Sequence, residues 1–275
     1  MPGVEVQAGA VRRDATEMTA TLQGRPVRAV LFDYGGTLAF FKRPDVALLS
    51  AYERISSRLL AGGQAAPTGQ ELLRDVHDRV EAEFLRHRQS GTLEEIDLVA
   101  VARDAYAAAG VTLTDEVLDD VLRIEQEAWW EGVQVNPDAA PTLDVLRSAG
   151  VKVGVCSNAP YRARSLHDQL GHVGLREHLD SATFSAEVGW CKPDSRMFIA
   201  ALRPLRAEAS EAVMVGDSEH DDIAGAHGVG MRAVLYRPPS ADGGEPAGSA
   251  AEYVIQRLSE LPTLLGLVHP AYTGR

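Results

Sequence analysis

Acidic, hydroxyl and lysine side chains follow several short apolar runs that are typical of buried strands. These side chains are Asp33 after the first run, Ser157 and Asn158 after the second, Lys192 in the loop after the third and Asp217 after the fourth. Ligands of open parallel sheets bind at the carboxyl ends of the strands, so we expect these groups to converge. Carboxylates hold Mg²⁺, and lysine and hydroxyl donors hold phosphate oxygens. The pattern predicts a site for metal-assisted phosphoryl transfer.

Strands alternate with helices in the second half of the chain. Short apolar runs predict the strands, and the stretches between them carry apolar residues at helical spacing. The strands are predicted at residues 28–33, 151–156, 182–185, 212–216 and 231–236, and the helices at 139–148, 162–170, 196–205, 223–227 and 255–265. Alternation with short joints implies right-handed crossovers. The predicted fold class is α/β, with a Rossmann-like parallel sheet as its core.

An all-helical insertion is predicted after the first strand. Apolar residues at helical spacing recur between breaks at glycines, and the expected helices cover residues 46–60, 71–88, 97–109 and 115–129. We therefore predict an inserted helical domain at residues 42–136 and a core domain made of residues 27–41 and 137–275. Residues 1–26 show no clear periodicity and are predicted to be a flexible tail.

The composition narrows the class of protein. The chain has 275 residues, of which 45% are hydrophobic, enough for a sizeable core. Its formal net charge of -12 disfavours nucleic acid and anionic membranes as partners. No apolar run reaches the roughly 18 residues of a membrane helix. Cys156 and Cys191 lack the spacing of a disulfide framework or a metal site. We expect a cytoplasmic enzyme, monomeric or homodimeric, with no nucleic-acid or membrane partner.

Four motifs in order resemble those of the haloacid dehalogenase superfamily. They are DYGGTL at residues 33–38, VCSN at 155–158, CKPD at 191–194, and GDS at 216–218 followed by DIAGA at 222–226. Each motif alone is weak, but their order and the helical insertion between the first two make the likeness specific. The likeness covers residues 28 to 265. Within the superfamily, the chain resembles the subgroup whose helical insertion acts as a cap over the site.

The resemblance implies a role for each matching residue. Asp33 is expected to attack phosphorus and form an aspartyl-phosphate intermediate on a small phosphorylated metabolite. Thr37 and Ser157 are expected to position the nucleophile or the phosphoryl oxygens, and Lys192 to balance their charge. The phosphate-binding residues that the resemblance implies are Gly36, Ser157, Asn158 and Lys192.

The resemblance also implies Mg²⁺ as the cofactor. Its expected ligands are Asp33, the backbone carbonyl of Gly35, Asp217 and Asp222. Asp222 is expected to act on the metal shell or on Lys192. The neighbouring Asp221 remains an alternative, although the residues that follow Asp222 favour Asp222.

Gly35 departs from the pattern of the hydrolytic members. Those members usually carry an aspartate at this position, which protonates the leaving group and then activates water. Glycine cannot transfer a proton, and such general acid–base catalysis contributes about 10²- to 10⁴-fold in rate. We favour a phosphatase whose substrate has a good leaving group or whose proton comes from the cap.

Three other readings stay open. The protein could instead break a carbon–phosphorus or carbon–halogen bond, although the dehalogenase branch differs at the fourth motif, where this chain keeps Gly216 and Asp217. It could transfer the phosphoryl group to an acceptor other than water. It could also be a catalytically silent binding module, a reading that the joint presence of Asp33, Ser157 and Lys192 disfavours.

Several further residues have two interpretations. His220 is expected to be a loop residue, with a proton relay as the alternative. Trp129 and Trp130 are expected to pack near the hinge, with substrate stacking as the alternative. Lys42 and Arg43 are expected to be solvated, with contact to a substrate anion as the alternative. The cap is expected to open about loops near residues 40–45 and 131–137.

Overall fold

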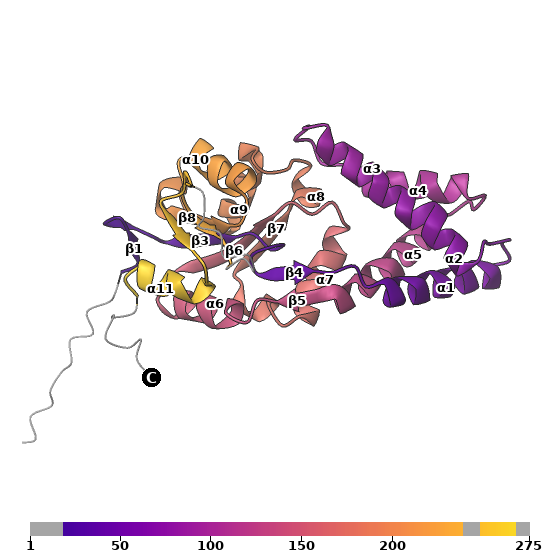
Figure 1. Ribbon diagram of the computed structural model, residues 1–275, viewed down its shortest axis with the longest axis horizontal. Helices are drawn as coiled ribbons and strands as arrows, with labels where there is room; N and C mark the ends of the chain where they lie inside the picture. Colours follow the sequence, from indigo (N-terminus) through magenta and orange to yellow (C-terminus); the bar gives the residue numbers. More distant parts are fainter. Residues whose placement is uncertain (1–18, 239–247, 268–275) are drawn as a thin grey trace, which may run out of the picture.

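A six-stranded parallel sheet forms the core of the protein. The computed structural model describes residues 19–238 and 248–267, and Figure 1 shows the sheet at one end of an elongated molecule. The strands, in their order across the sheet, are β10 (Tyr253–Ile255), β9 (Arg232–Tyr236), β8 (Ala212–Gly216), β3 (Ala29–Phe32), β6 (Lys152–Ser157) and β7 (Ser181–Phe184). All neighbouring strands run parallel. The α/β fold class is therefore confirmed.

The central strand β3 is apolar throughout because both of its faces are covered. Val30 and Phe32 point into one hydrophobic cluster, and Ala29 and Leu31 into another. This alternation is the two-residue period of a strand. The first cluster includes side chains of α6 (Ala139–Ser148), α7 (Ala163–His172) and α11 (Leu261–Leu264), and the second includes those of α9 (Ser195–Leu205) and α10 (Gly225–Gly228).

A helical unit occupies the other end of the molecule (Figure 1). It consists of α1 (Asp45–Ala61), α2 (Gly69–Leu72), a π-helical turn (Leu73–His77), α3 (Asp78–Gln89), α4 (Leu98–Ala108) and α5 (Asp115–Ala128). These helices enclose a hydrophobic cluster of their own, centred on side chains such as Tyr52 and Val121. Thr114 caps α5 by accepting the Val117 backbone N–H. None of the described helices has both the length and the apolar character needed to cross a membrane.

Two antiparallel strands join the core to the helical unit. β4 (Ala39–Phe41) pairs with β5 (Val133–Val135), which follows the 3₁₀ turn Trp129–Gly132. Beyond the pair, the Lys42 N–H donates to the Gly132 carbonyl at 2.9 Å. Loops were expected near residues 40–45 and 131–137. Part of these two connections is instead a two-stranded antiparallel ribbon.

The predicted flexible tail is wrong for its last residues. β1 (Thr21–Leu22) and β2 (Arg25–Pro26) form a small antiparallel pair, and Leu22 is fully buried. Strands of two residues are too short to leave a periodic pattern in the sequence. Residues 1–18 of the predicted tail lie outside the described residues.

The helix predicted at residues 255–265 is also wrong in its first part. Residues 253–255 are the edge strand β10, which is followed by a 3₁₀ turn (Leu258–Glu260) and the short helix α11. The helix predicted at residues 223–227 is divided between the π-helical turn Glu219–Ala224 and α10. In short segments, periodicity cannot separate a strand from a helix, nor one helical type from another.

Arg232 fastens the N-terminal strand pair to the sheet. Its buried guanidinium donates hydrogen bonds to the backbone carbonyls of Leu22, Arg25, Pro26 and Ser210, at 2.7 to 3.3 Å. These carbonyls are buried or partly buried, so they need a hydrogen-bond donor from the protein where water cannot reach them. One side chain therefore supplies donors for several segments that are distant in sequence.

We predict that Arg232→Met lowers the free energy of unfolding by about 2 kcal/mol, because it removes hydrogen bonds from a charged donor to these carbonyls. Urea denaturation monitored by circular dichroism measures the change. The exposed Arg164 provides the control Arg164→Met. Equal unfolding midpoints for the two variants would contradict the prediction.

Candidate active site

The strand ends gather the residues that the sequence singled out. Asp33, Ser157 and Asp217 follow or end β3, β6 and β8, which are neighbours in the sheet. The parallel register sets Phe32 opposite Val155 and Val215, so the three strands end at one level. The expected convergence at this edge is therefore present in the structure.

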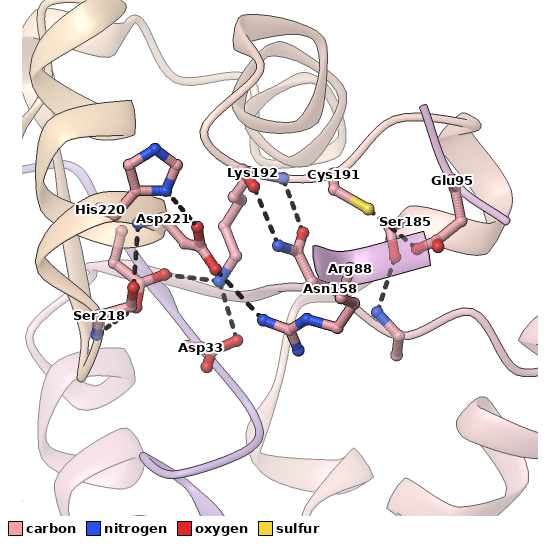
Figure 2. A network of polar contacts seen from close by, with 12 residues as sticks. Asp33, Arg88, Glu95, Asn158, Ser185, Cys191, Lys192, Ser218, His220 and Asp221 are labelled. Carbon is pink, nitrogen blue, oxygen red and sulfur yellow. Dashed lines mark hydrogen bonds and ion pairs between the residues drawn. The ribbon is translucent and has the colours of Figure 1, made fainter. Parts of the chain in front are cut away.

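Lys192 lies at the centre of the site (Figure 2). Its ammonium nitrogen Nζ lies 2.9 Å from Oδ1 of Asp33 and 2.5 Å from Oδ1 of Asp222. All three residues are buried, and Asp222 is wholly inaccessible to solvent. A buried ammonium group is tolerated only when it is paired and hydrogen-bonded. Two carboxylates meet this requirement here.

Asn158 holds the backbone of Lys192 in place. Its side-chain oxygen accepts the Lys192 backbone N–H at 2.7 Å, and its amide nitrogen donates to the Lys192 carbonyl at 3.1 Å. Figure 2 shows the two residues paired in this way. The second and third motifs are thereby locked together, and the lysine side chain is directed toward Asp33.

Burial and charge shift the pKa values of the cluster. Burial raises the pKa of Asp222 to about 7, although the Lys192 ammonium acts in the opposite direction. Burial lowers the pKa of Lys192, but the carboxylates of Asp222 and Asp33 outweigh it and hold that pKa above its usual value. Burial, aided by the charge of Asp33, raises the pKa of Asp217. The lysine stays charged at neutral pH.

Asp33, Asp217 and Asp222 form an acidic cluster. Each offers one carboxylate oxygen, and the three oxygens lie within 4.8 Å of one another. Hard cations such as Mg²⁺ prefer oxygen ligands of this kind. Both oxygens of Asp222 already accept hydrogen bonds, one from Lys192 and the other from the Ser218 backbone N–H. The geometry therefore favours Asp33 and Asp217 as cation ligands and Asp222 as the partner of Lys192.

Gly36 leaves room for Asp217. A Cβ atom on Gly36 would lie 2.4 Å from Oδ2 of Asp217, and the backbone there has a φ of +82°. Both observations exclude most side chains at this position. Glycine thus allows the Asp217 carboxylate to lie against the first motif.

Two hydroxyl residues of the motifs are buried at the site. Thr37 is fully buried, and its hydroxyl has no hydrogen-bond partner among the described residues. Ser157 is 4% exposed and lines the same cavity as Asp33. Unlike Ser157, Thr37 is not among the residues that line this cavity, so its hydroxyl is shielded from the cavity in the described structure.

A cavity of about 540 Å³ lies at this edge of the sheet, and we call it the acidic cavity. Its lining includes Asp33, Gly35, Ser157, Lys192 and Asp217. Gly35 brings no side chain to the cavity. A Cβ atom there would lie 3.5 Å from the Phe41 ring, which is an ordinary contact distance.

Arg88 of α3 is a further residue at the site, and none of the four sequence motifs includes it. Arg88 lines the acidic cavity, and its guanidinium nitrogen Nη2 lies 3.9 Å from Oδ2 of Asp221 (Figure 2). No periodicity of its own helix predicts a contact with a loop 133 positions away. Asp221 therefore faces the helical unit, whereas Asp222 faces Lys192.

His220 and Arg43, two further candidates from the sequence, lie outside the lining of the acidic cavity. The His220 side chain is 75% exposed and contacts Asp221. Arg43 pairs with Asp45 and Asp78 in the helical unit. Neither His220 nor Arg43 is among the residues that line the acidic cavity in the described part of the chain.

Comparison with known proteins identifies related hydrolases. Residues 27–230 match the family described as haloacid dehalogenase-like hydrolases. A ribulose-1,5-bisphosphate 5-phosphatase of Halopiger xanaduensis is 37% identical over 149 residues, which are 50% of this chain and 62% of the relative. The match thus spans less than two thirds of that relative. A glyceraldehyde 3-phosphate phosphatase of Methanopyrus kandleri is 28% identical over 86% of this chain and 95% of its own length.

A solved structure shows the same arrangement. The crystal structure of a 2-haloacid dehalogenase from Pseudomonas syringae is similar with a TM-score of 0.60 and 30% identity. The match covers 87% of this chain and 98% of that chain. Both the core and the helical unit therefore have counterparts in a protein of known structure.

We predict that Lys192→Met destabilises the protein by about 3 kcal/mol at pH 8, because it leaves buried carboxylates without their cation. Asp222 already has a raised pKa, and it can escape this cost by binding a proton. The loss relative to the natural protein should therefore shrink at pH 5, below the folded-state pKa.

Urea unfolding at both pH values measures this effect. Lys152→Met is the control, because Lys152 pairs with Asp180 at 2.9 Å but its side chain is 56% exposed. An equal loss for Lys192→Met at pH 5 and pH 8 would contradict the account of Asp222.

Proposed function

Because this chain belongs to the haloacid dehalogenase-like hydrolases, we propose that it hydrolyses a phosphate monoester of a small metabolite through Asp33. The observation that carries the proposal is the position of Lys192 between Asp33 and Asp222, next to the carboxylate of Asp217. Relatives named as phosphatases of ribulose bisphosphate and glyceraldehyde 3-phosphate support this reaction class. Dehalogenation is less favoured, because an acidic cluster that recruits a cation suits a charged phosphate better than a neutral carbon–halogen bond.

The first step forms a bond between an Asp33 carboxylate oxygen and phosphorus. The bond from phosphorus to the leaving oxygen breaks, and that oxygen departs with the electron pair and takes a proton from water. Lys192 holds Asp33 in position through one oxygen. Ser157 and the backbone around Gly36 line the cavity in which the phosphoryl oxygens would lie, whereas the role of Thr37 requires its shielded hydroxyl to become accessible.

The acidic cluster is suited to Mg²⁺. The ion would be held by Asp33, the Gly35 carbonyl and Asp217, and would offset the repulsion between carboxylate and phosphate. Asp222 acts through Lys192 in this account, since both of its oxygens are engaged.

In the second step, water attacks the phosphorus of the aspartyl phosphate and releases inorganic phosphate. Gly35 supplies neither the acid of the first step nor the base of the second. Unless another group supplies the acid and the base, the first step depends on a leaving group that needs little protonation, and the second step depends on slow attack by unassisted water. A phosphotransferase remains the second candidate, because a long-lived intermediate can meet another acceptor.

We propose that the helical unit acts as a cap. It is joined to the core by β4 and β5, and Arg88 reaches from α3 to Asp221 beside the acidic cavity. Movement about the ribbon would open the site for the substrate, and closure would exclude water.

Asp33→Asn is predicted to lower magnesium-dependent phosphate release by at least about a thousandfold, because an amide is a poor nucleophile. Phosphate release from a panel of sugar, acyl and aryl phosphates, with and without Mg²⁺, measures it. The exposed Asp144 provides the control Asp144→Asn, and circular dichroism checks the fold. Full activity of Asp33→Asn would refute the role of Asp33.

Gly35→Asp is predicted to raise kcat for an aliphatic phosphate by about a hundredfold, because the new carboxyl group can protonate the leaving oxygen. The Phe41 ring lies at an ordinary contact distance from the added Cβ, so the fold should accept the change. Gly35→Asn is the control of equal size without an acid. If neither variant gains activity, another group already supplies the proton.

A further inference from the structure

A second cavity adjoins the acidic cavity. It has a volume of about 200 Å³ and lies between the core and the helical unit, with walls from α3, α5 and α7. Gly35, Phe41, Ser157 and Asn158 line both cavities. A molecule whose phosphate lies beside Asp33 can therefore extend directly into it. We call it the aromatic cavity.

Aromatic rings form much of the wall of this cavity. Six of its lining residues are aromatic, namely Tyr34, Phe41, Phe84, Trp129, Trp130 and Tyr161. None of its lining residues in the described part of the chain is charged. The third cavity at this junction differs, since its walls include His87, Arg88 and Glu95. A charged group would lose its hydration in the aromatic cavity without gaining a partner.

Two polar atoms in the wall lack partners. The indole N–H of Trp130 and the side-chain carbonyl oxygen of Gln126 are shielded from solvent, and neither is hydrogen-bonded within the described residues. One can donate a hydrogen bond and the other can accept one. Because both atoms are shielded from solvent, a ligand would reach them only after a rotation of the side chains.

The size of the cavity suits a single ring. An apolar cavity of about 150 Å³ holds benzene. Aromatic rings favour edge-to-face and offset contacts with other rings, which adds to the burial of apolar surface. Tyr34 and Phe41 already meet edge to face, with ring centroids 5.3 Å apart.

Gly35 connects this cavity with the chemistry of the site. A side chain at position 35 would point toward the Phe41 ring, so a general acid there would lie where the two cavities meet. At position 35 the chain has a glycine instead of an acid, and the apolar ring of Phe41 lies beside it. A phenol has a pKa of about 10, whereas aliphatic alcohols are far weaker acids that ionise about as little as water does. An aryl oxide can therefore depart without the proton that Gly35 cannot give.

On the premise of the proposed function, we propose that the aromatic cavity binds the leaving group and that the substrate is the phosphate monoester of an uncharged phenol. The Asp33 oxygen forms a bond to phosphorus as the bond from phosphorus to the aryl oxygen breaks. The aryl oxide leaves with the electron pair and is protonated by water, and water then releases phosphate from Asp33.

The test compares phenyl phosphate with glyceraldehyde 3-phosphate in the presence of Mg²⁺. We expect kcat/KM to be at least about tenfold higher for phenyl phosphate. Phe84→Ala should lower that value by about tenfold, because it removes ring surface that the bound phenyl group would cover. The neighbouring Leu85 is 55% exposed and lines neither cavity, so Leu85→Ala is the matched control.

Phenol binding to the Asp33→Asn protein, measured by saturation-transfer NMR, tests the cavity without any turnover. Binding that Phe84→Ala weakens and Leu85→Ala does not would support the proposal. Absence of phenol binding, or a preference for glyceraldehyde 3-phosphate that Phe84→Ala leaves unchanged, would overturn it while leaving the phosphatase proposal intact. No phosphate release from any substrate would instead refute the hydrolytic function. The phenol-binding measurement alone would then show whether the aromatic cavity binds an uncharged phenol.

Discussion

The burial of one ammonium group governs the site. Lys192 is 3% exposed and would be destabilising there without the carboxylates of Asp33 and Asp222. Asp217 adds a further carboxylate beside this pair. Three acids against one lysine leave an excess of negative charge, which repels a phosphate unless a cation joins the cluster. The pairing with Lys192 thus holds the carboxylate that we propose as the nucleophile, and the excess of acids favours the binding of a cation.

In the proposed reaction, the charged groups act on the phosphate and the apolar surroundings select the substrate. The acidic cavity is built from strand ends, and its charged groups suit the phosphate chemistry that we propose. Gly35 removes the usual proton donor, and Phe41 places a ring at the same junction. These two features reinforce each other, because an aromatic leaving group both fits the adjoining cavity and needs less help to depart.

Much of the core and the site was predictable, because strand ends carry their own signals. Runs such as Ala29–Phe32 are apolar on both faces, and the parallel order brings Asp33 and Asp217 together. Features that depend on contacts between distant segments were not predictable. Arg88 meets Asp221 only because α3 of the helical unit reaches the core. Trp129 and Trp130 line the aromatic cavity, and the sequence offered a contact with substrate only as the alternative to packing near the hinge. Helical periodicity shows which face is apolar but not what that face contacts.

The stereochemical course at phosphorus tests the central claim most directly. An aryl ester of isotopically chiral thiophosphate, hydrolysed in labelled water, would report whether phosphorus is attacked once or twice. Attack by Asp33 followed by attack by water consists of two inversions, so the account predicts net retention of configuration. Net inversion would show that water attacks the substrate directly, and would contradict the role of Asp33 as the nucleophile.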